Sequence, residues 1–192
     1  MKNKLALDLS TTCMGYSLFN DKEELITGYK LFDGEDHLGR GKQLKEYLTG
    51  IFEQYKTIDT VIIEERLQAF SGGRTSTDTI LKLAQFNFLG QWICQEDFKC
   101  KVITLGVQTA RKQAYPHIKL NRKGVDYKKL FLEENTKKYG KDWIPMDTLS
   151  RKTVRGNAGD KVQSKYALDT SDSLILLTAF VNMENNKKNE AK

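Results

Sequence analysis

Two short apolar runs of the sequence each meet a carboxylate. Asp8 is the one charged residue in the run 5–9, and Glu64 and Glu65 directly follow the apolar, β-branched run 61–63. An ionised carboxylate at the centre of a sheet is costly unless it is paired or bound to a metal ion. Asp8 could instead close a strand and begin a turn, and exposed glutamates are common at strand ends. Because side chains alternate along a strand, only one of the two glutamates can share the face of Asp8.

A second pair of carboxylates opens the last predicted helix. Asp169 and Asp172 are three residues apart, so both project from one side of the first turn. Aspartate also favours helix starts because it caps them and suits the helix dipole, which is the ordinary alternative. The positions of all four acids taken together are more informative than either pair of acids alone. The predicted topology gathers the end of the first strand, the end of the fourth strand and the start of this helix.

A cluster of four carboxylates needs positive charge close to it. Without cations the acids would repel one another and raise their own pKa values. Hard oxygen ligands select Mg²⁺, for which Mn²⁺ can substitute. Two such ions can activate a water on one side of a phosphodiester and stabilise the leaving oxygen on the other. The residues therefore predict a metal-dependent site for phosphodiester hydrolysis, built from Asp8, one of the two glutamates, Asp169 and Asp172.

Hydrophobic periodicity predicts the elements that would position these acids. Three strands form a meander, a helix crosses over to a fourth strand, and a long apolar helix leads to a fifth. A basic, irregular segment with one helix precedes the closing helix. The expected strands are 5–9, 14–19, 25–31, 61–63 and 102–105, and the expected helices are 44–55, 75–96, 125–139 and 169–181. This order is similar to that of RNase H-like domains: an α/β fold with a mixed five-stranded sheet flanked by helices on both faces.

The 192 residues are enough for one core of ordinary size. We expect a single nuclease domain over 1–185, with a basic insertion or mobile segment at about 140–165 and a disordered tail at 186–192. Residues 101–165 hold 16 Lys or Arg and 6 Asp or Glu, a local charge of +10 within a chain of net charge +6. Such a cationic region fits a polyanion such as DNA or RNA, although a solvated basic surface is the plain alternative.

Cysteine use and hydropathy indicate a soluble, cytoplasmic protein. The three cysteines form no CxxC pair, which suggests neither a disulfide framework nor a zinc site. The N-terminus lacks the apolar segment of a signal peptide, and the longest apolar stretch, 174–181, is too short to span a bilayer. We therefore expect no association with a membrane.

Three parts of the chain carry a more specific signal: LALDLSTTCMGYS at 5–17, VIIEE at 61–65 with LKLAQFNFLG at 81–90, and ALDTSDSLILL at 167–177. They resemble the RuvC-like Holliday junction resolvases, in particular their phage-encoded relatives. The resemblance implies a catalytic and metal-binding set of Asp8, Glu64, Asp169 and Asp172. Glu65 replaces Glu64 if the register shifts by one. The resemblance covers most of the chain in order but is weak between 108 and 165.

This resemblance implies a Mg²⁺-dependent endodeoxyribonuclease that resolves four-way or other branched DNA by paired nicks, in the cytoplasm of a bacterium or of a phage-infected host. A homodimer is also suggested by the helix 75–96, which is apolar on more sides than one sheet can cover. The residues nominated for DNA contact are Phe70, as a wedge or stacking residue, and the basic group Arg74, Lys112, Arg122, Lys123, Lys128 and Lys129. Two alternatives stay open: another RNase H-like nuclease that acts on RNA or an RNA–DNA hybrid, and a nucleic-acid-binding domain without catalysis.

Overall fold

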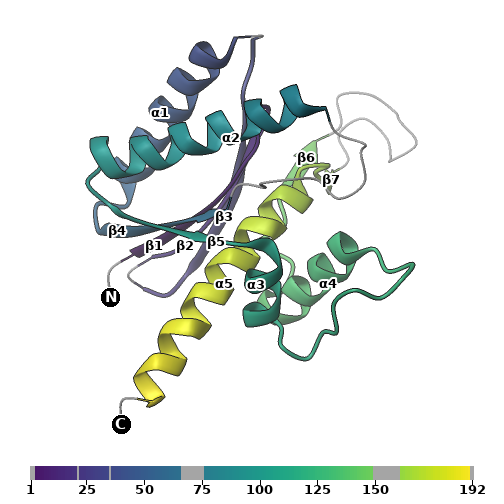
Figure 1. Ribbon diagram of the computed structural model, residues 1–192. Coiled ribbons are helices and arrows are strands. Elements are labelled where there is room, and N and C mark those ends of the chain that lie inside the picture. The colour runs from purple at the N-terminus through teal and green to yellow at the C-terminus, as the bar shows by residue number, and fades with distance from the viewer. Residues whose placement is uncertain (1–2, 21, 35, 66–75, 149–160, 191–192) are drawn as a thin grey trace.

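The computed structural model describes residues 3–20, 22–34, 36–65, 76–148 and 161–190. Its centre is a mixed five-stranded sheet with helices on both faces (Figure 1), which confirms the predicted architecture. Among the helices in these residues, none is both long and apolar enough to cross a membrane.

The sheet combines a meander with two parallel strands. β1 (Asn3–Leu9), β2 (Cys13–Phe19) and β3 (Leu25–Leu31) are consecutive and antiparallel. β4 (Ile58–Glu64) pairs parallel to β1, and β5 (Lys101–Leu105) pairs parallel to β4. The spatial order is β3-β2-β1-β4-β5, so β1, β4 and β5 end at the same edge of the sheet.

One face of the sheet is covered by α1 (His37–Gln54) and α2 (Thr77–Trp92), and a π-helical turn, η1 (Ile93–Asp97), continues α2. The side chains of Asp36 and Ser76 accept backbone N–H groups in the first turns of α1 and α2, which is why the two helices begin there.

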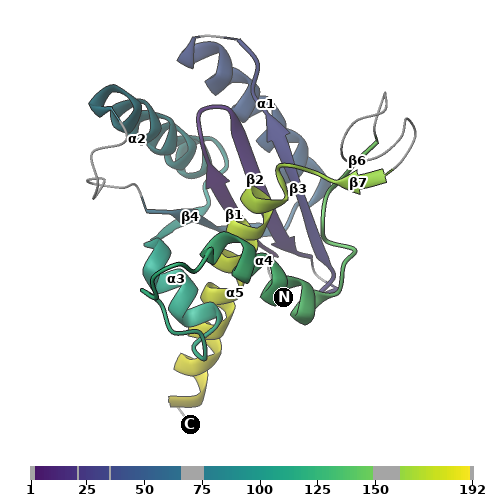
Figure 2. The same cartoon turned by 90° about the vertical axis from the view of Figure 1, so that its right-hand side faces the viewer.

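The other face carries α3 (Val107–Ala114), α4 (Tyr127–Tyr139) and α5 (Ala167–Glu190), with α5 lying directly on β1 and β2. A small hairpin of β6 (Met146–Thr148) and β7 (Lys161–Gln163) stands beyond β3 (Figure 2). The chain therefore forms three layers, with the sheet in the middle.

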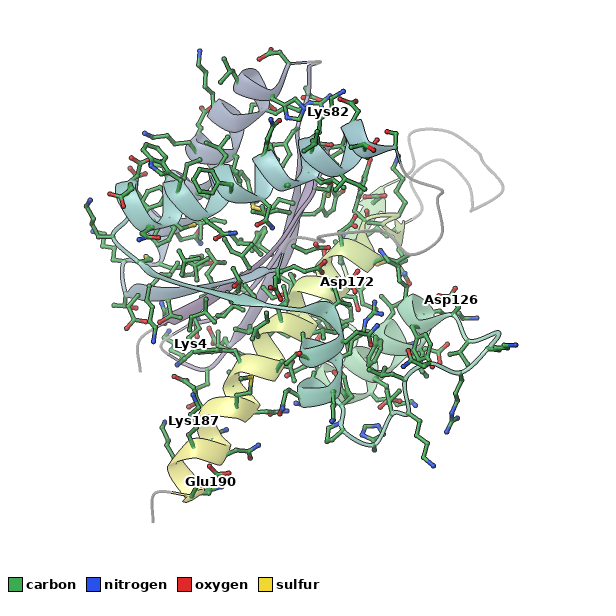
Figure 3. All side chains as sticks on the ribbon, in the orientation of Figure 1. Lys4, Lys82, Asp126, Asp172, Lys187 and Glu190 are labelled. Atoms are coloured by element: carbon green, nitrogen blue, oxygen red, sulfur yellow. The ribbon has the colours of Figure 1, made fainter. Side chains whose placement is uncertain are left out.

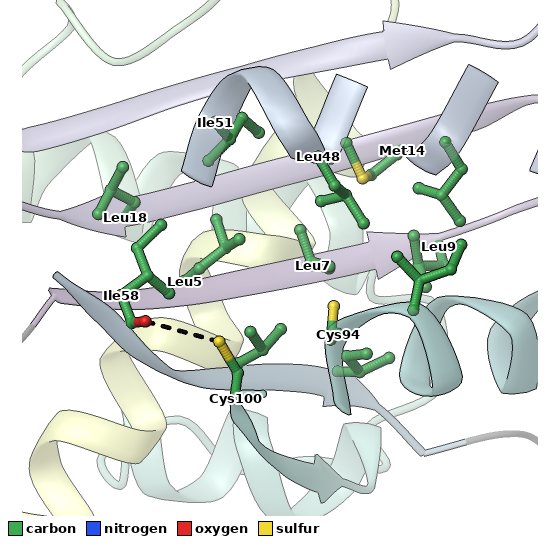
Figure 4. Close-up of a cluster of buried hydrophobic side chains, with 14 of the residues drawn as sticks. Leu5, Leu7, Leu9, Met14, Leu18, Leu48, Ile51, Ile58, Cys94 and Cys100 are labelled. Carbon is green, nitrogen blue, oxygen red and sulfur yellow. Dashed lines mark hydrogen bonds between the residues drawn. The ribbon is translucent and has the colours of Figure 1, made fainter. Parts of the chain in front are cut away.

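Alternation along β1 fills a core on each side of the sheet. Leu5, Leu7 and Leu9 are buried under α1 and α2 (Figure 4). Ala6 is buried on the opposite side, in the cluster that includes the apolar residues of α5. Asp8 continues the alternation of Ala6 and therefore faces α5.

The sequence does not predict α3, which lies in the stretch expected to be irregular. The buried residues of α3 are Ala110 and Ala114, one helical turn apart. Two alanines give no stripe of large apolar side chains, so the periodicity that reveals the other helices is missing here. Tertiary packing on α5 stabilises this short helix instead.

The C-terminal part departs from the expectation of a disordered tail. The tail expected to be disordered from residue 186 is helical as far as Glu190, because α5 continues without a break and Lys187 and Lys188 suit the negative end of its dipole. Part of the segment 140–165 is an ordered hairpin, which is tied to β3 by a hydrogen bond of 2.9 Å from the Tyr29 hydroxyl to Asp147. Residues 149–160 of this segment lie outside the described ranges.

Candidate active site

Asp8 and Glu64 lie side by side at the C-terminal ends of β1 and β4. In the parallel pairing of these strands Leu7 is level with Ile63, so the next residues, Asp8 and Glu64, are level as well. Level residues on neighbouring parallel strands point to the same face of a sheet. Both carboxylates therefore face α5.

The structure distinguishes Glu64 from Glu65. Glu64 is one of the negative charges that act on Asp8, whereas Glu65 is exposed. The side chain of Glu65 lies instead beside Gly106, the residue before α3: one of its carboxylate oxygens is 3.1 Å from where a Cβ on Gly106 would be. Glu64 is therefore the glutamate that lies beside Asp8 on the face toward α5.

A glycine in β2 lets the first turn of α5 reach the sheet next to Asp8. Gly15 is the partner of Asp8 in the ladder between β1 and β2. A Cβ at Gly15 would lie 2.2 Å from the carbonyl oxygen of Asp169 and 2.8 Å from the amide nitrogen of Thr170. No larger residue fits there unless α5 moves away. The close approach brings Asp169 to the two strand carboxylates.

The four acids act on one another as one cluster of negative charge. Burial raises the pKa of Asp8, and the charges of Asp172, Glu64 and Asp169 raise it further. Burial and the charge of Asp172 raise the pKa of Glu64 to about 7. Burial also raises the pKa of Asp169, against the opposing effect of Lys128. The predicted acids are thus brought together, and nearby cations offset their charge only in part.

Two cations from the neighbouring helices reach Asp172, in the stretch of α5 beside α3 and α4 (Figure 3). Lys128 Nζ of α4 lies 3.3 Å from Asp172 Oδ2, and Arg111 Nη2 of α3 lies 3.8 Å from Asp172 Oδ1. The guanidinium of Arg111 also lies over the ring of Phe131, with 5.3 Å between Cζ and the ring centroid. Partial burial lowers the pKa of Lys128, but the charge and hydrogen bond of Asp172, together with the charges of Asp8 and Asp169, outweigh this, and the net shift is upward.

The four carboxylates are not packed into a closed set of metal ligands. Within the described ranges no three His, Cys, Asp or Glu side chains converge as metal ligands. Asp172 is turned to Lys128 and Arg111. The donors are carboxylate oxygens with raised pKa values at Asp8 and Glu64, so the cluster suits a hard divalent cation in both charge and donor type.

The nominated DNA-contacting residues fall into three groups. Lys128 lies in the acidic cluster. Phe70 and Arg74 lie outside the described residues. The remaining four are exposed on α3, on α4 and on the connection between them: Lys112, Arg122, Lys123 and Lys129.

No family model matches the sequence, and no curated protein matches it significantly. The fold, in contrast, is that of solved structures. RuvC of Thermus thermophilus in complex with a Holliday junction substrate superposes with a TM-score of 0.60, covering 95% of this chain and 96% of that one at 10% identity. The chain has the RuvC fold. The yeast mitochondrial Holliday junction resolvase Ydc2 superposes with a TM-score of 0.59 at 9% identity, over 97% of this chain and 80% of its own.

Arg111 is the residue of this RuvC-fold site that sequence reasoning missed. It stands next to Lys112, which was nominated but is exposed, and Arg111 points to Asp172. The available signal was the pair Ala110 and Ala114, whose spacing of four marks the buried face of a short helix. In so basic a stretch, sequence alone gives no reason to prefer one cation over its neighbours.

The raised pKa of Glu64 predicts how pH changes stability in the RuvC-fold domain without metal. Between the ordinary value of 4.5 and about 7, the folded protein keeps the Glu64 proton while the unfolded chain loses it. The folded state therefore binds more protons, and the free energy of unfolding falls as pH rises through this window. Glu64→Gln should flatten the profile. Urea unfolding in EDTA at several pH values across the window would measure it, and a stability that rises with pH for the wild type would contradict the electrostatic account.

Proposed function

We propose that this chain is a structure-selective endonuclease that resolves Holliday junctions by hydrolysing phosphodiesters with divalent metal ions. The observation that carries the proposal is the meeting of Asp8, Glu64 and Asp169 with Asp172 on one face of a RuvC fold. The fold likeness extends over almost the whole of the chain and of RuvC, which was solved with a junction. A site of buried, mutually repelling acids has no evident structural benefit and is costly to fold, so a functional role accounts for it better.

The four acids are the proposed ligands of Mg²⁺, with Mn²⁺ as a substitute. Bound divalent ions would activate the attacking water and stabilise the leaving oxygen. The strands fix Asp8 and Glu64, because both belong to a buried ladder, whereas Asp169 and Asp172 move only with α5. Rigid placement of this kind is what a hydrolytic site needs.

Lys128 and Arg111 are the proposed phosphate contacts nearest to the chemistry. Both are within 4 Å of Asp172 here, and a phosphate that enters the site would offer them a second anion. The exposed cations of α3 and α4 extend the positive surface outward from this point, where they would hold the arms of a branched DNA. Their contribution should weaken with added salt, since it comes from the release of counterions.

A cleavage assay on three substrates tests the proposal directly. We expect Mg²⁺-dependent nicking of a four-way junction, with little cleavage of linear duplex DNA or of an RNA–DNA hybrid. The same protein with Asp8→Asn is the control for a contaminating nuclease. Preferred cleavage of the hybrid would replace the proposal by an RNase H-like activity, and binding without any cleavage would leave a nucleic-acid-binding domain.

We further propose that the enzyme acts as a homodimer that pairs through α2. Leu81, Phe88 and Trp92 lie on α2 with side chains that are 56%, 63% and 48% exposed. Their spacing of seven and four residues places them along one stripe of the helix. A stripe of large apolar side chains is a typical protein interface, and a junction nicked on two strands needs two sites.

Phe88→Glu should convert the dimer into a monomer, because it places a charge in the middle of the apolar stripe. Light scattering at micromolar concentration would show this as a halved mass, with paired nicking reduced to single nicks. Met146→Glu is the matched control, since Met146 is similarly exposed but lies on β6. A monomeric wild type, with and without junction DNA, would contradict the proposed dimer.

A further inference from the structure

One buried amide connects the three helices that carry Arg111, Lys128, Asp169 and Asp172. Asn135 of α4 is fully buried. Its Nδ2 donates to the carbonyl oxygen of Ser171 at 3.1 Å and lies 2.9 Å from the Ser171 hydroxyl. Its Oδ1 accepts a short hydrogen bond from the hydroxyl of Tyr115, which ends α3. Ser171 belongs to α5, so one side chain joins α3, α4 and α5.

Asn135 lies on the face of α4 that carries Lys128. Lys128, Phe131 and Asn135 follow one another at intervals of three and four residues, so they form one stripe toward α5. Phe131 is fully buried within this stripe and packs against the ring of Tyr115, with 5.8 Å between the centroids. The guanidinium of Arg111, from α3, lies over the ring of Phe131 in the same stripe.

The anchor point on α5 is next to the acids. Ser171 directly precedes Asp172. Asn135 Nδ2 contacts both the carbonyl oxygen and the hydroxyl of Ser171. A rotation or a shift of α4 along α5 would break these hydrogen bonds and also separate Lys128 from Asp172. The hydrogen bonds have a defined geometry, whereas apolar packing against α5 alone would allow several registers.

We infer that Asn135 is a positioning residue: its hydrogen bonds to Ser171 and Tyr115 hold α3 and α4 in the register on α5 that places Arg111 and Lys128 at Asp172. The consequence for cleavage rests on the function proposed above, while the placement of Lys128 does not. Asn135 itself contacts neither the acids nor, in the proposed reaction, the DNA.

A second hydrogen bond between the same helices provides a control. The hydroxyls of Tyr139 on α4 and Thr178 on α5 are 2.8 Å apart, about two turns further along α5 from Asp172. Tyr139→Phe removes a hydrogen bond between α4 and α5 without touching the charged cluster. If Asn135 only stabilised the packing of α4, the two variants would have the same kind of effect.

The first measurement needs neither DNA nor metal. Competitive acetylation with an amine-reactive ester, read by mass spectrometry, compares Lys128 with its neighbour Lys129; both are exposed, but only Lys128 is paired with Asp172 among the ion pairs described above. In the wild type and in Tyr139→Phe, Lys128 should react several-fold more slowly, because Asp172 holds its ammonium group. Asn135→Leu, an apolar side chain of similar size, should bring the two rates together. Slow reaction of Lys128 in Asn135→Leu, or equal rates in the wild type, would overturn the inference.

The second measurement is junction nicking under saturating Mg²⁺. Asn135→Leu should lower kcat by about 10- to 100-fold with a small change in KM, as expected for a residue that orients an active-site group. Combined with Lys128→Ala, it should lower kcat by less than the product of the two single effects, because both changes remove the contribution of Lys128. Independent, multiplying effects would contradict the positioning role.

One outcome separates this inference from the proposed function. Suppose that neither the wild type nor any variant cleaves a junction, but the acetylation rate of Lys128 changes as described. Asn135 then positions Lys128, and the proposed function is wrong. If Asn135→Leu does not fold, Tyr115→Phe takes its place, since it keeps the ring against Phe131 and removes one hydrogen bond of the network. Tyr115→Phe should then show the same loss of Lys128 protection in smaller degree, and full protection would overturn the inference.

Discussion

Asp172→Asn is expected to lose junction nicking by orders of magnitude while it binds the junction in EDTA at least as tightly as the wild type. The substitution keeps the shape of the side chain but removes one charge and one good oxygen ligand for Mg²⁺. Asp172 is paired with Lys128 and Arg111. The neutral amide would leave both cations available to DNA phosphates and would remove one repulsive charge, so affinity should rise.

Folding should change little in this variant. The ion pair with the half-exposed Lys128 contributes at most about 1 kcal/mol. The Arg111 contact, at 3.8 Å, is too long for a hydrogen bond, and the loss of repulsion on Asp8 and Glu64 compensates for both pairs. Helix capping, the ordinary alternative for an aspartate near a helix start, does not apply to Asp172, because α5 begins five residues earlier at Ala167.

The measurement is paired: band-shift affinity in EDTA and the nicking rate in Mg²⁺, on one four-way junction. Asp97→Asn is the matched control, since Asp97 is ion-paired with Lys45 on the opposite side of the sheet. That variant should leave both quantities unchanged. Near-normal nicking by Asp172→Asn would remove Asp172 from the site, and joint loss of binding and folding would show a structural role.

Gly15→Ala is expected to damage both stability and cleavage through a single methyl group. Its Cβ would lie 2.2 Å from the carbonyl oxygen of Asp169, and a backbone atom cannot rotate out of the way as a flexible side chain can. The start of α5 must shift, at a cost of about 1–3 kcal/mol, as in other overpacked cores. The same shift moves Asp169 and Asp172 relative to Asp8, so nicking should fall even where the protein is fully folded.

Gly50→Ala separates this steric effect from the general effect of replacing glycine. Gly50 lies inside α1, and a Cβ there would meet no atom within 4 Å. This variant should be as stable as the wild type or up to about 1 kcal/mol more stable, with unchanged nicking. Urea unfolding and single-turnover nicking test both variants together. A Gly15→Ala protein with normal stability and normal nicking would show that α5 need not approach the sheet so closely.

The fold was predictable because its elements have clear local patterns. β1 and β4 contain short apolar runs and α1 has a regular apolar stripe, so the mixed sheet with helices on both faces follows from periodicity and crossover rules. α3 was not predictable, since its buried side chains are two alanines. The helical end of α5 was missed for a related reason: the polar residues after Val181 resemble those of a tail, and the helix there simply continues one that is held by the core.

The sequence by itself determined which residues could form the site, because Asp8 interrupts an apolar strand, the glutamates follow another, and Asp169 and Asp172 share one side of a helix start. Tertiary structure alone decided between Glu64 and Glu65, since the choice depends on which face of β4 meets α5. It also decided that Arg111 lies at Asp172 and that Asn135 holds the adjacent Ser171. Local patterns report how one element is buried, whereas the partners of a charge or a buried amide come from segments distant in sequence, and only packing brings these together.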